Sequence, residues 1–149
     1  AKIQVLEKEK ILLEKEGTVL FTHWGISGPV IFNTSLWLGY HYEKNFKNLR
    51  IKLTIPADQI TKRLLSYLKA PKGLKNYILT LRPTNLRSRD EAKVMSGGIL
   101  FEEVNDHFEV KKMPWAFILG EALNITGETW GFNLQWCWTS AFFCSNHIK

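Results

Sequence analysis

The stretch GEALNITGETWGFNLQWCWTS, residues 120–140, decides how the C-terminal part of the chain folds. An apolar run, WAFIL at 115–119, precedes it and predicts a strand that ends at Gly120-Glu121. A short glycine-punctuated loop follows, and the residues from about 134 to 148 predict one long apolar helix. An acidic residue at the end of a strand, with a glycine and an asparagine at the head of a helix, suits either a cofactor site or an ordinary buried helix cap.

Upstream of residue 90, short apolar runs predict a β-rich part that holds one clear helix. The turn GISGP at 25–29 leads into VIFNTSLWL, so a helix should take Ser27 as its N-cap, hold Pro29 in its first turn and run to about Leu38. Strict alternation of polar and apolar residues predicts a strand at 49–55. Earlier strands are expected at 3–6, 11–14 and 18–22.

A second helical segment is expected after Pro56. Asp58 is its candidate cap, and Ile60, Leu64, Leu65 and Leu68 fall on one helical face. Residues 73–82 are expected to add a helical turn or two, and residues 82–93 to form a loop and an edge strand. The whole pattern predicts an α+β fold, mixed α and β, in two unequal parts with a seam near residues 86–92.

Composition limits the classes of partner. The chain has 149 residues, enough for one domain with a buried core, and its 20 Lys and Arg exceed its 14 Asp and Glu by six. Because the basic residues are scattered and the aromatic ones lie mainly in apolar runs, we expect a solvated basic surface and do not expect nucleic acid as a partner. Six tryptophans predict a heavy core or an apolar surface that something else covers.

Membrane, secretory and metal-binding classes find no support in the sequence. No apolar run reaches the roughly 18 to 20 residues of a membrane span, and the N-terminus does not resemble a signal peptide, so we expect a cytoplasmic protein without membrane contact. Cys137 and Cys144 lie on one expected helix, about 10 Å apart along its axis, too far for a mutual disulfide. The four histidines are dispersed, so no metal site is expected.

Motifs for catalysis are sparse. His23 precedes Ser27 by four residues, but G-x-S-G differs from the G-x-S-x-G of a nucleophile elbow, and a histidine beside a capping serine is the preferred interpretation. No G-x-G-x-x-G and no P-loop pattern occurs, so a dinucleotide bound here would lack its usual pyrophosphate loop. The pair Gly97-Gly98 suits a backbone that approaches a ligand closely, or a simple turn or bulge.

Three ordered blocks resemble the HI0933-like family of NAD(P)/FAD-dependent flavoproteins related to aminoacetone oxidase. They are FTHWGISGPVIFNTS (21–35), EAKVMSGGI (91–99) and FILGEALNITGETWGFNLQWCWTSAF (117–142). The resemblance runs from about residue 15 to the end, and it is weak between residues 57 and 80. It implies an FAD-binding α/β fold interrupted by an insert. The implied parts are the end of a β-rich insert domain (1–57), its shortened helical part (58–89) and the C-terminal segment of the FAD-binding domain (90–149).

The resemblance also implies that FAD is the cofactor. Glu121 would hydrogen-bond a ribityl hydroxyl, and the N-terminus of the last helix would face the pyrimidine edge of the flavin, where a partly buried site would stabilise negative charge by about 1 to 2 kcal/mol. The flavin would carry the redox chemistry, and no residue identifies itself as catalytic; His23 is the one candidate acid or base. The implied cofactor-binding residues are Gly97, Gly98, Gly120, Glu121, Gly131, Phe132 and Asn133.

Departures from the family pattern leave two functions open. Trp130 replaces a family glycine, which should block a close flavin approach there, and Asn124 replaces an aspartate. The family's N-terminal dinucleotide-binding half lies outside these 149 residues. The chain is therefore either a partial FAD-dependent oxidoreductase that needs an N-terminal half, or a degenerate remnant that acts as a non-catalytic interaction module without flavin. The tryptophan-rich helix would be covered by that half or in a homo-oligomer.

Overall fold

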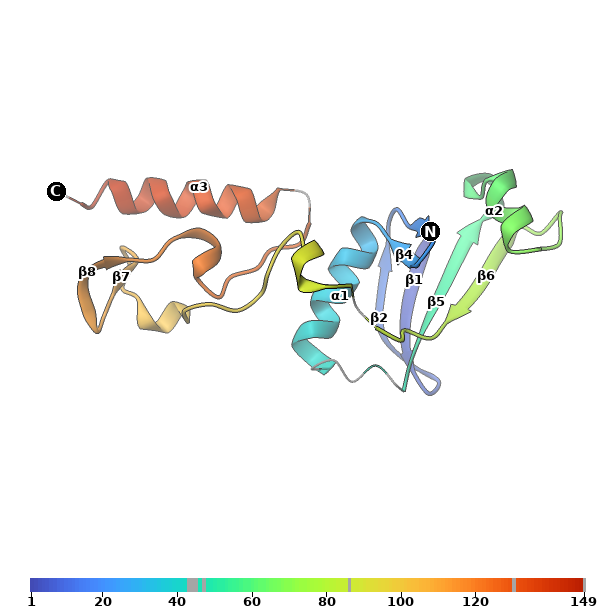
Figure 1. Ribbon diagram of the computed structural model, residues 1–149, viewed down its shortest axis with the longest axis horizontal. Coiled ribbons are helices and arrows are strands. Elements are labelled where there is room, and N and C mark those ends of the chain that lie inside the picture. The colour runs from blue at the N-terminus through green and yellow to red at the C-terminus, as the bar shows by residue number, and fades with distance from the viewer. Residues whose placement is uncertain (43–45, 47, 86, 130, 149) are drawn as a thin grey trace. The chain divides into compact units, whose positions relative to one another are not determined.

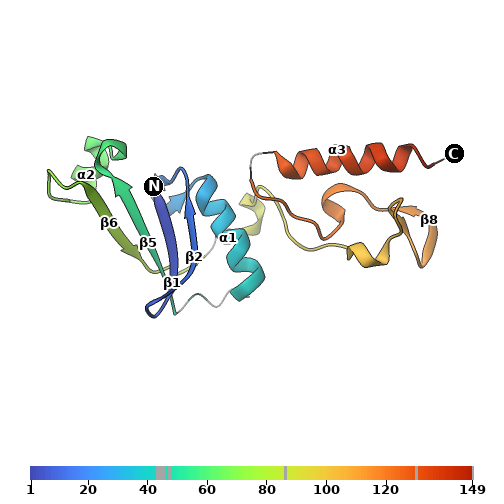
Figure 2. The ribbon, with the colours of Figure 1, turned by 180° about the vertical axis from the view of Figure 1, so that it is seen from behind.

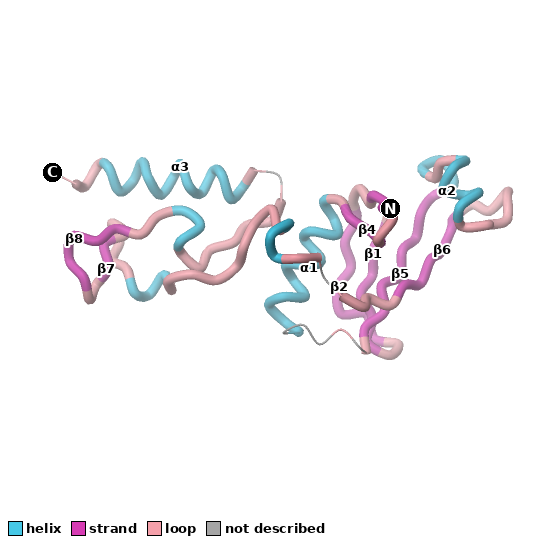
Figure 3. Tube along the Cα trace, in the orientation of Figure 1, coloured by secondary structure: helices cyan, strands magenta, loops and turns pink. Residues whose placement is uncertain are grey.

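The computed structural model describes residues 1–42, 46, 48–85, 87–129 and 131–148. They form two compact units, Ala1–Leu86 and Arg87–Lys149, which we describe separately. Helices and strands both contribute substantially, as the cyan and magenta segments of Figure 3 show, so the predicted α+β class is confirmed. The finer assignment to an insert domain, its helical part and an FAD-binding segment stays a prediction.

The first unit is built on a four-stranded antiparallel sheet with the strand order β2-β1-β5-β6 (Figure 1). Along the central strand β5, every second residue from Leu49 to Ile55 is buried, and the residues between are half-buried. This alternation, which the sequence predicts, directs one apolar face of the sheet toward the core. The strands are β1 (Lys2–Glu7), β2 (Lys10–Glu16), β5 (Leu49–Pro56) and β6 (Asn76–Leu81).

Helix α1 (Pro29–Tyr42) packs against that apolar face, and Figures 1 and 2 both show it beside β1 and β2. Its buried residues Val30, Thr34 and Leu38 recur every four positions, so they form one stripe along the helix. The buried Thr34 hydroxyl donates a hydrogen bond to the Val30 carbonyl at 2.7 Å, which satisfies it inside the core. The core of this unit comprises Ile3, Val5, Val30, Leu38, Phe46, Leu49, Ile51 and Leu53.

The start of α1 corrects one prediction. A short hairpin, β3 (Leu20–Thr22) and β4 (Gly25–Ser27), precedes the helix, so Ser27 is a strand residue and not the N-cap. The Gly28 carbonyl accepts the first helical hydrogen bonds instead. Gly28 has a φ of 106°, and a Cβ there would lie 2.7 Å from the Thr18 carbonyl oxygen. Only glycine fits this position, and it takes the place that the capping serine was expected to hold.

The region between β5 and β6 corrects two further predictions. Asp58 lies in the short 3₁₀ helix η1 (Ala57–Gln59), whereas α2 (Lys62–Tyr67) is capped by Thr61, whose hydroxyl accepts a hydrogen bond from the Leu64 amide at 3.2 Å. Residues 76–81 form strand β6 and not helical turns, because pairing with β5 buries Tyr77 and satisfies the backbone. Within the described part of 82–93 there is no strand, only the 3₁₀ helix η2 (Arg89–Glu91).

The second unit surrounds one face of the long helix α3 (Phe132–Ser145) with short elements. Helix α3 begins two residues before the predicted start and ends three before the predicted end. The elements that precede it are η3 (Phe101–Glu103), β7 (Glu109–Val110), β8 (Met113–Phe117) and η4 (Gly120–Ala122). Its core comprises Val104, Phe108, Leu123 and Cys144, with Val110, Phe117, Ile118, Leu119, Ile125 and Trp136 packed around them.

None of the described helices is both long enough and apolar enough to span a membrane.

Candidate functional site

The seven predicted cofactor-binding residues all lie in the second unit, on three segments. Gly97 and Gly98 belong to the loop between η2 and η3. Gly120 and Glu121 begin η4, directly after the apolar run that ends at Leu119. The other three form the N-terminal end of α3, where Gly131 is the N-cap and Phe132 and Asn133 are the first helical residues.

The loop that holds Gly97 and Gly98 runs beside the residues that follow η4. The Ile99 amide donates to the Ala122 carbonyl at 2.9 Å, and the Asn124 amide donates to the Ile99 carbonyl at 2.8 Å. Gly98 has a φ of 118°, and a Cβ there would lie 2.4 Å from the same Ala122 oxygen. Gly98 is therefore required by the packing of two backbone segments within the unit.

Glu121 ties the same two segments together from the other side. Its side chain is exposed on η4, and its Oε1 accepts a hydrogen bond from the Met95 amide at 2.8 Å. No hydrogen bond joins Oε2 to any residue that the structure describes. Glu121 thus positions the loop that leads to the glycine pair, and one carboxylate oxygen is left for another donor.

Gly120 docks η4 onto the middle of α3. Its amide donates to the buried Ser140 hydroxyl at 3.0 Å, and its carbonyl accepts from the Trp136 indole N–H at 3.1 Å. Its φ is 59°, and a Cβ there would lie 2.8 Å from the Cys137 sulfur. The structure therefore explains Gly120 by helix packing.

The N-terminal end of α3 is held by Asn133. Its side-chain Oδ1 accepts from the Gly127 amide at 2.8 Å, and its Nδ2 donates to the Gly127 carbonyl at 3.1 Å. This pair of hydrogen bonds fixes the turn that enters the helix. Because both polar atoms of the amide are used within the protein, Asn133 is a positioning residue for the helix end.

Gly97, Gly131 and Phe132 differ from the packed residues because they are open to solvent. Gly97 has a φ of 112° and Gly131 a φ of 96°, and a Cβ at either position would have no described group within 4 Å apart from its chain neighbours. The Phe132 side chain is 64% exposed. The first N–H groups of α3 have no acceptor inside the helix, and they give this end a partial positive charge.

This open end fits part of a flavin. Backbone without side chains lets a flat ring approach closely, and unpaired N–H groups at a helix N-terminus suit a ligand that accepts hydrogen bonds and gains negative charge. Trp130, which was expected to block the approach, lies outside the described residues. The assignment of the seven residues to a cofactor stays a prediction.

Several residues that build this end were not singled out in the sequence. Met95 contributes only its backbone amide, which no side-chain pattern reveals. Trp136 and Ser140 lie four residues apart and so share one face of α3, but helical spacing alone does not show that this face receives Gly120. Gly127 carries a detectable signal, since it stands in the glycine-punctuated loop.

His23 and Ser27, the alternative catalytic pair, lie in the other unit. The His23 ring lies beside that of the neighbouring Trp24, tilted by 43° with 3.3 Å between ring centroids, and Ser27 pairs with Leu20 in the β3–β4 hairpin. No hydrogen bond joins the two side chains in the described residues. In both units, the described His, Cys, Asp and Glu residues form no group of three that could hold a metal ion.

Comparison with known proteins identifies the family. The family model described as the HI0933-like protein barrel and H2TH domain matches residues 1–89. The chain belongs to the HI0933-like family. No solved structure gives a significant match to this HI0933-like chain.

Three curated relatives of this HI0933-like chain cover most of its length. The ribosomal RNA dihydrouridine synthase of Escherichia coli K12 is 25% identical over 183 residues, covering 93% of the chain and 45% of the relative. The 3-dehydro-bile acid delta(4,6)-reductase of Clostridium scindens is 24% identical over 191 residues, covering 95% and 46%. The ribosomal RNA dihydrouridine synthase of Haemophilus influenzae is 30% identical over 174 residues, covering 88% and 42%. The chain therefore spans less than half the length of these relatives.

Proposed function

We propose that the second unit forms the flavin-ring end of the FAD site of a flavin-dependent oxidoreductase, completed by an N-terminal dinucleotide-binding half. The observation that carries this proposal is the pair of open, positive-φ glycines, one of which caps α3. The backbone geometry at Gly97 and Gly131 favours glycine, yet apart from the chain neighbours no residue that the structure describes would lie within 4 Å of a Cβ at either position.

The relatives support the redox class. One kind is named as a synthase of dihydrouridine in ribosomal RNA, and another as a reductase of a 3-dehydro bile acid. These names describe different substrates, so they leave the substrate of this chain open. They share reductive chemistry, which a bound flavin supplies.

The residues of this chain would bind and orient the flavin. The α3 N-terminus carries about half a positive charge, and it would stabilise negative charge on a bound ring by about 0.3 to 1 kcal/mol, or up to about 2 kcal/mol where water is partly excluded. The free oxygen of Glu121 would accept a hydrogen bond from a ligand hydroxyl, while its partner oxygen keeps the Met95 amide in place.

The adenylate end of FAD has no counterpart in this chain, because no G-x-G-x-x-G sequence occurs. We therefore propose that the N-terminal half supplies that end of the site. If so, the chain by itself should bind riboflavin, FMN and FAD with the same affinity, since the phosphates and adenine add no contacts. This equality distinguishes a half-site from a complete FAD site.

The test is a titration of the purified chain with each flavin, followed by flavin fluorescence. We expect three dissociation constants within about threefold of one another, and weaker binding by Gly131→Ala. Gly73→Ala is the matched control, because Gly73 also has a positive φ of 85° with nothing within 4 Å, but lies in the first unit. Absence of binding by all three flavins, or FAD binding more than tenfold tighter than riboflavin, would contradict the half-site.

One observation favours the alternative, a non-catalytic interaction module. Leu134, Trp138 and Phe142 recur every four residues along α3, and their side chains are 69%, 75% and 66% exposed. An apolar helix stripe of this kind is normally covered. Sedimentation analysis tests this alternative. A chain that binds no flavin but forms a homo-oligomer, which Trp138→Glu disrupts, would support the interaction module. A monomer that binds flavin would favour the oxidoreductase half.

A further inference from the structure

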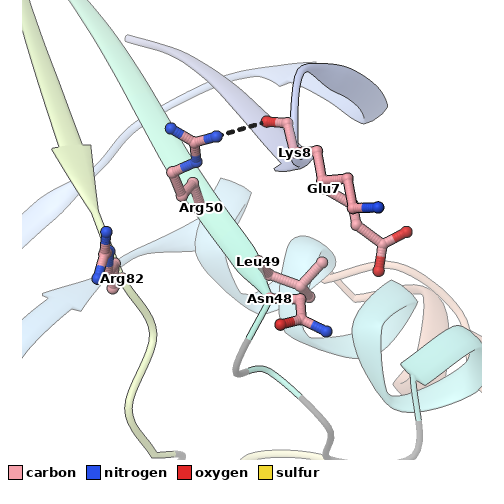
Figure 4. A pocket seen from close by; sticks show the side chains of 6 residues that line it. All are labelled: Glu7, Lys8, Asn48, Leu49, Arg50 and Arg82. Atoms are coloured by element: carbon pink, nitrogen blue, oxygen red, sulfur yellow. Dashed lines mark hydrogen bonds between the residues drawn. The ribbon is translucent and has the colours of Figure 1, made fainter.

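The first unit has a pocket at one end of its sheet that the flavin proposal does not use. The β1–β2 turn, the start of β5 and the end of β6 meet there around a hollow of about 590 Å³ (Figure 4). Polar and charged residues make up five of the six residues in its wall. The lining residues are Glu7, Lys8, Asn48, Leu49, Arg50 and Arg82.

The two arginines that line the pocket, Arg50 and Arg82, come from adjacent strands or their direct continuation. Ile51 pairs with Leu81, so extending the antiparallel register by one residue brings Arg50 opposite Arg82 on the same face of the sheet. Like charges opposite each other on a sheet are destabilising, and Lys8 adds a third cation to a wall that holds one carboxylate, that of Glu7. An anion bound between them would remove this repulsion.

The two arginines differ in what holds them. The Nη2 of Arg50 donates to the Lys8 carbonyl at 2.8 Å and to the Glu9 carboxylate at 3.0 Å. The β1–β2 turn therefore positions this guanidinium. The Glu9 side chain is 91% exposed, which leaves that ion pair well solvated and weak. Arg82 is exposed, and it makes no hydrogen bond or ion pair with any residue that the structure describes.

Positive charge is concentrated in this unit. Residues 1–86 hold 14 Lys and Arg against 6 Asp and Glu, a net charge of +8, whereas residues 87–149 hold 6 against 8, a net charge of −2. The excess of +6 for the whole chain therefore hides a strongly basic unit and a slightly acidic one. Such an asymmetry attracts polyanions to one unit.

We propose that this pocket binds the phosphodiester backbone of RNA. A guanidinium fork matches two phosphate oxygens, and the held Arg50 and the unpaired Arg82 would present two such forks beside Lys8. RNA is the polyanion that we assign because two of the curated relatives are named as ribosomal RNA dihydrouridine synthases. The sequence analysis did not expect nucleic acid as a partner, because the basic residues are scattered along the chain. The fold brings basic residues together that lie far apart in the sequence.

This proposal is independent of the flavin site, and its test needs no flavin. Binding of a fluorescein-labelled 20-nucleotide single-stranded RNA to the full 149-residue chain is followed by fluorescence anisotropy between 50 and 200 mM NaCl. Arg82→Ala should raise the dissociation constant about fivefold at 50 mM and lower the slope of log affinity against log salt by about 0.7, the value for one single-strand phosphate contact. Lys8→Ala should act in the same direction.

Arg63→Ala is the matched control, because Arg63 is also exposed but lies on α2, outside the pocket. It removes the same charge from the same unit and should change the dissociation constant less than twofold. Circular dichroism verifies that each variant is folded. Equal losses for Arg82→Ala and Arg63→Ala would overturn the proposal, as would no RNA binding at 50 mM NaCl, or binding of inorganic phosphate without RNA.

Discussion

Replacing Gly98 and Gly97 separately with alanine should distinguish the packing role of Gly98 from the role in ligand binding that we propose for Gly97. Both residues have a φ near 115°, at 118° and 112°, so each alanine carries a similar backbone strain of about 1 to 3 kcal/mol. The space around them differs. At Gly98 the new Cβ would lie 2.4 Å from the Ala122 oxygen, and at Gly97 it would meet nothing within 4 Å.

The difference in stability follows from that contact. The Ala122 oxygen cannot keep its place at 2.4 Å, and it accepts the 2.9 Å hydrogen bond from the Ile99 amide, so Gly98→Ala strains or breaks this bond as well. Loss of the bond costs about 0.5 to 1.5 kcal/mol, and an amide left buried costs more. We expect Gly98→Ala to lower the free energy of unfolding by about 1 to 2 kcal/mol more than Gly97→Ala.

Urea unfolding monitored by tryptophan fluorescence measures this difference, because Trp136 lies against the core of the second unit. Gly97→Ala should retain most of the stability but lose affinity for riboflavin, whereas Gly98→Ala should lose stability. Equal destabilisation by both substitutions would refute the packing role of Gly98. Unchanged riboflavin affinity in a folded Gly97→Ala chain would refute the ligand-facing role of Gly97.

Three further outcomes follow from the second unit. Glu121→Ala should speed hydrogen exchange at the Met95 amide about fivefold while Glu121→Gln, which keeps an acceptor oxygen, changes it less; equal exchange in all three chains would contradict the clamp. Asn133→Ala should lower the free energy of unfolding by about 1 to 2 kcal/mol in urea, and Asn133→Asp, which keeps one of the two hydrogen bonds, should lower it less; no loss would contradict the clamp on the helix turn. Burial raises the pKa of the Cys144 thiol, so the folded state keeps its proton where the unfolded chain releases it, and stability should fall as the pH rises above about 8.5. Cys144→Ala should flatten that fall in thermal unfolding curves, and iodoacetamide should label the half-buried Cys137 first; a steeper fall or faster labelling of Cys144 would be contrary results.

The elements with a strong period could be predicted from the sequence. The alternation at 49–55 gives β5, and the apolar run after Pro29 gives α1, because burial on one face dictates both patterns. The segment at 76–81 was predicted wrongly because a half-exposed edge strand has a weak pattern, and pairing with β5 decides its conformation. The predicted N-cap of α1 was wrong for a similar reason. Gly28 takes the place of Ser27 because another backbone segment approaches closely there.

The candidate site could also be predicted only in part from the sequence. The sequence predicts Glu121 at the end of an apolar run and Gly131 just before a helix. The hydrogen-bond partner of Glu121 is a backbone amide, which has no sequence signal. Only the fold shows that Gly98 and Gly120 are fixed by packing whereas Gly97 and Gly131 are open. Clustering of charge across strands is equally invisible along the chain, which explains why Arg50 and Arg82 appeared scattered.

The most direct test of the flavin half-site is a map of backbone amide shifts in the isotopically labelled chain as riboflavin is added. The expected result is a saturable shift of the Gly97, Gly131 and Phe132 amides, with no shift of the amide of Gly73, an open glycine of the other unit. Shifts confined to the exposed stripe around Trp138, or no shifts at saturating riboflavin, would contradict a flavin at the N-terminal end of α3.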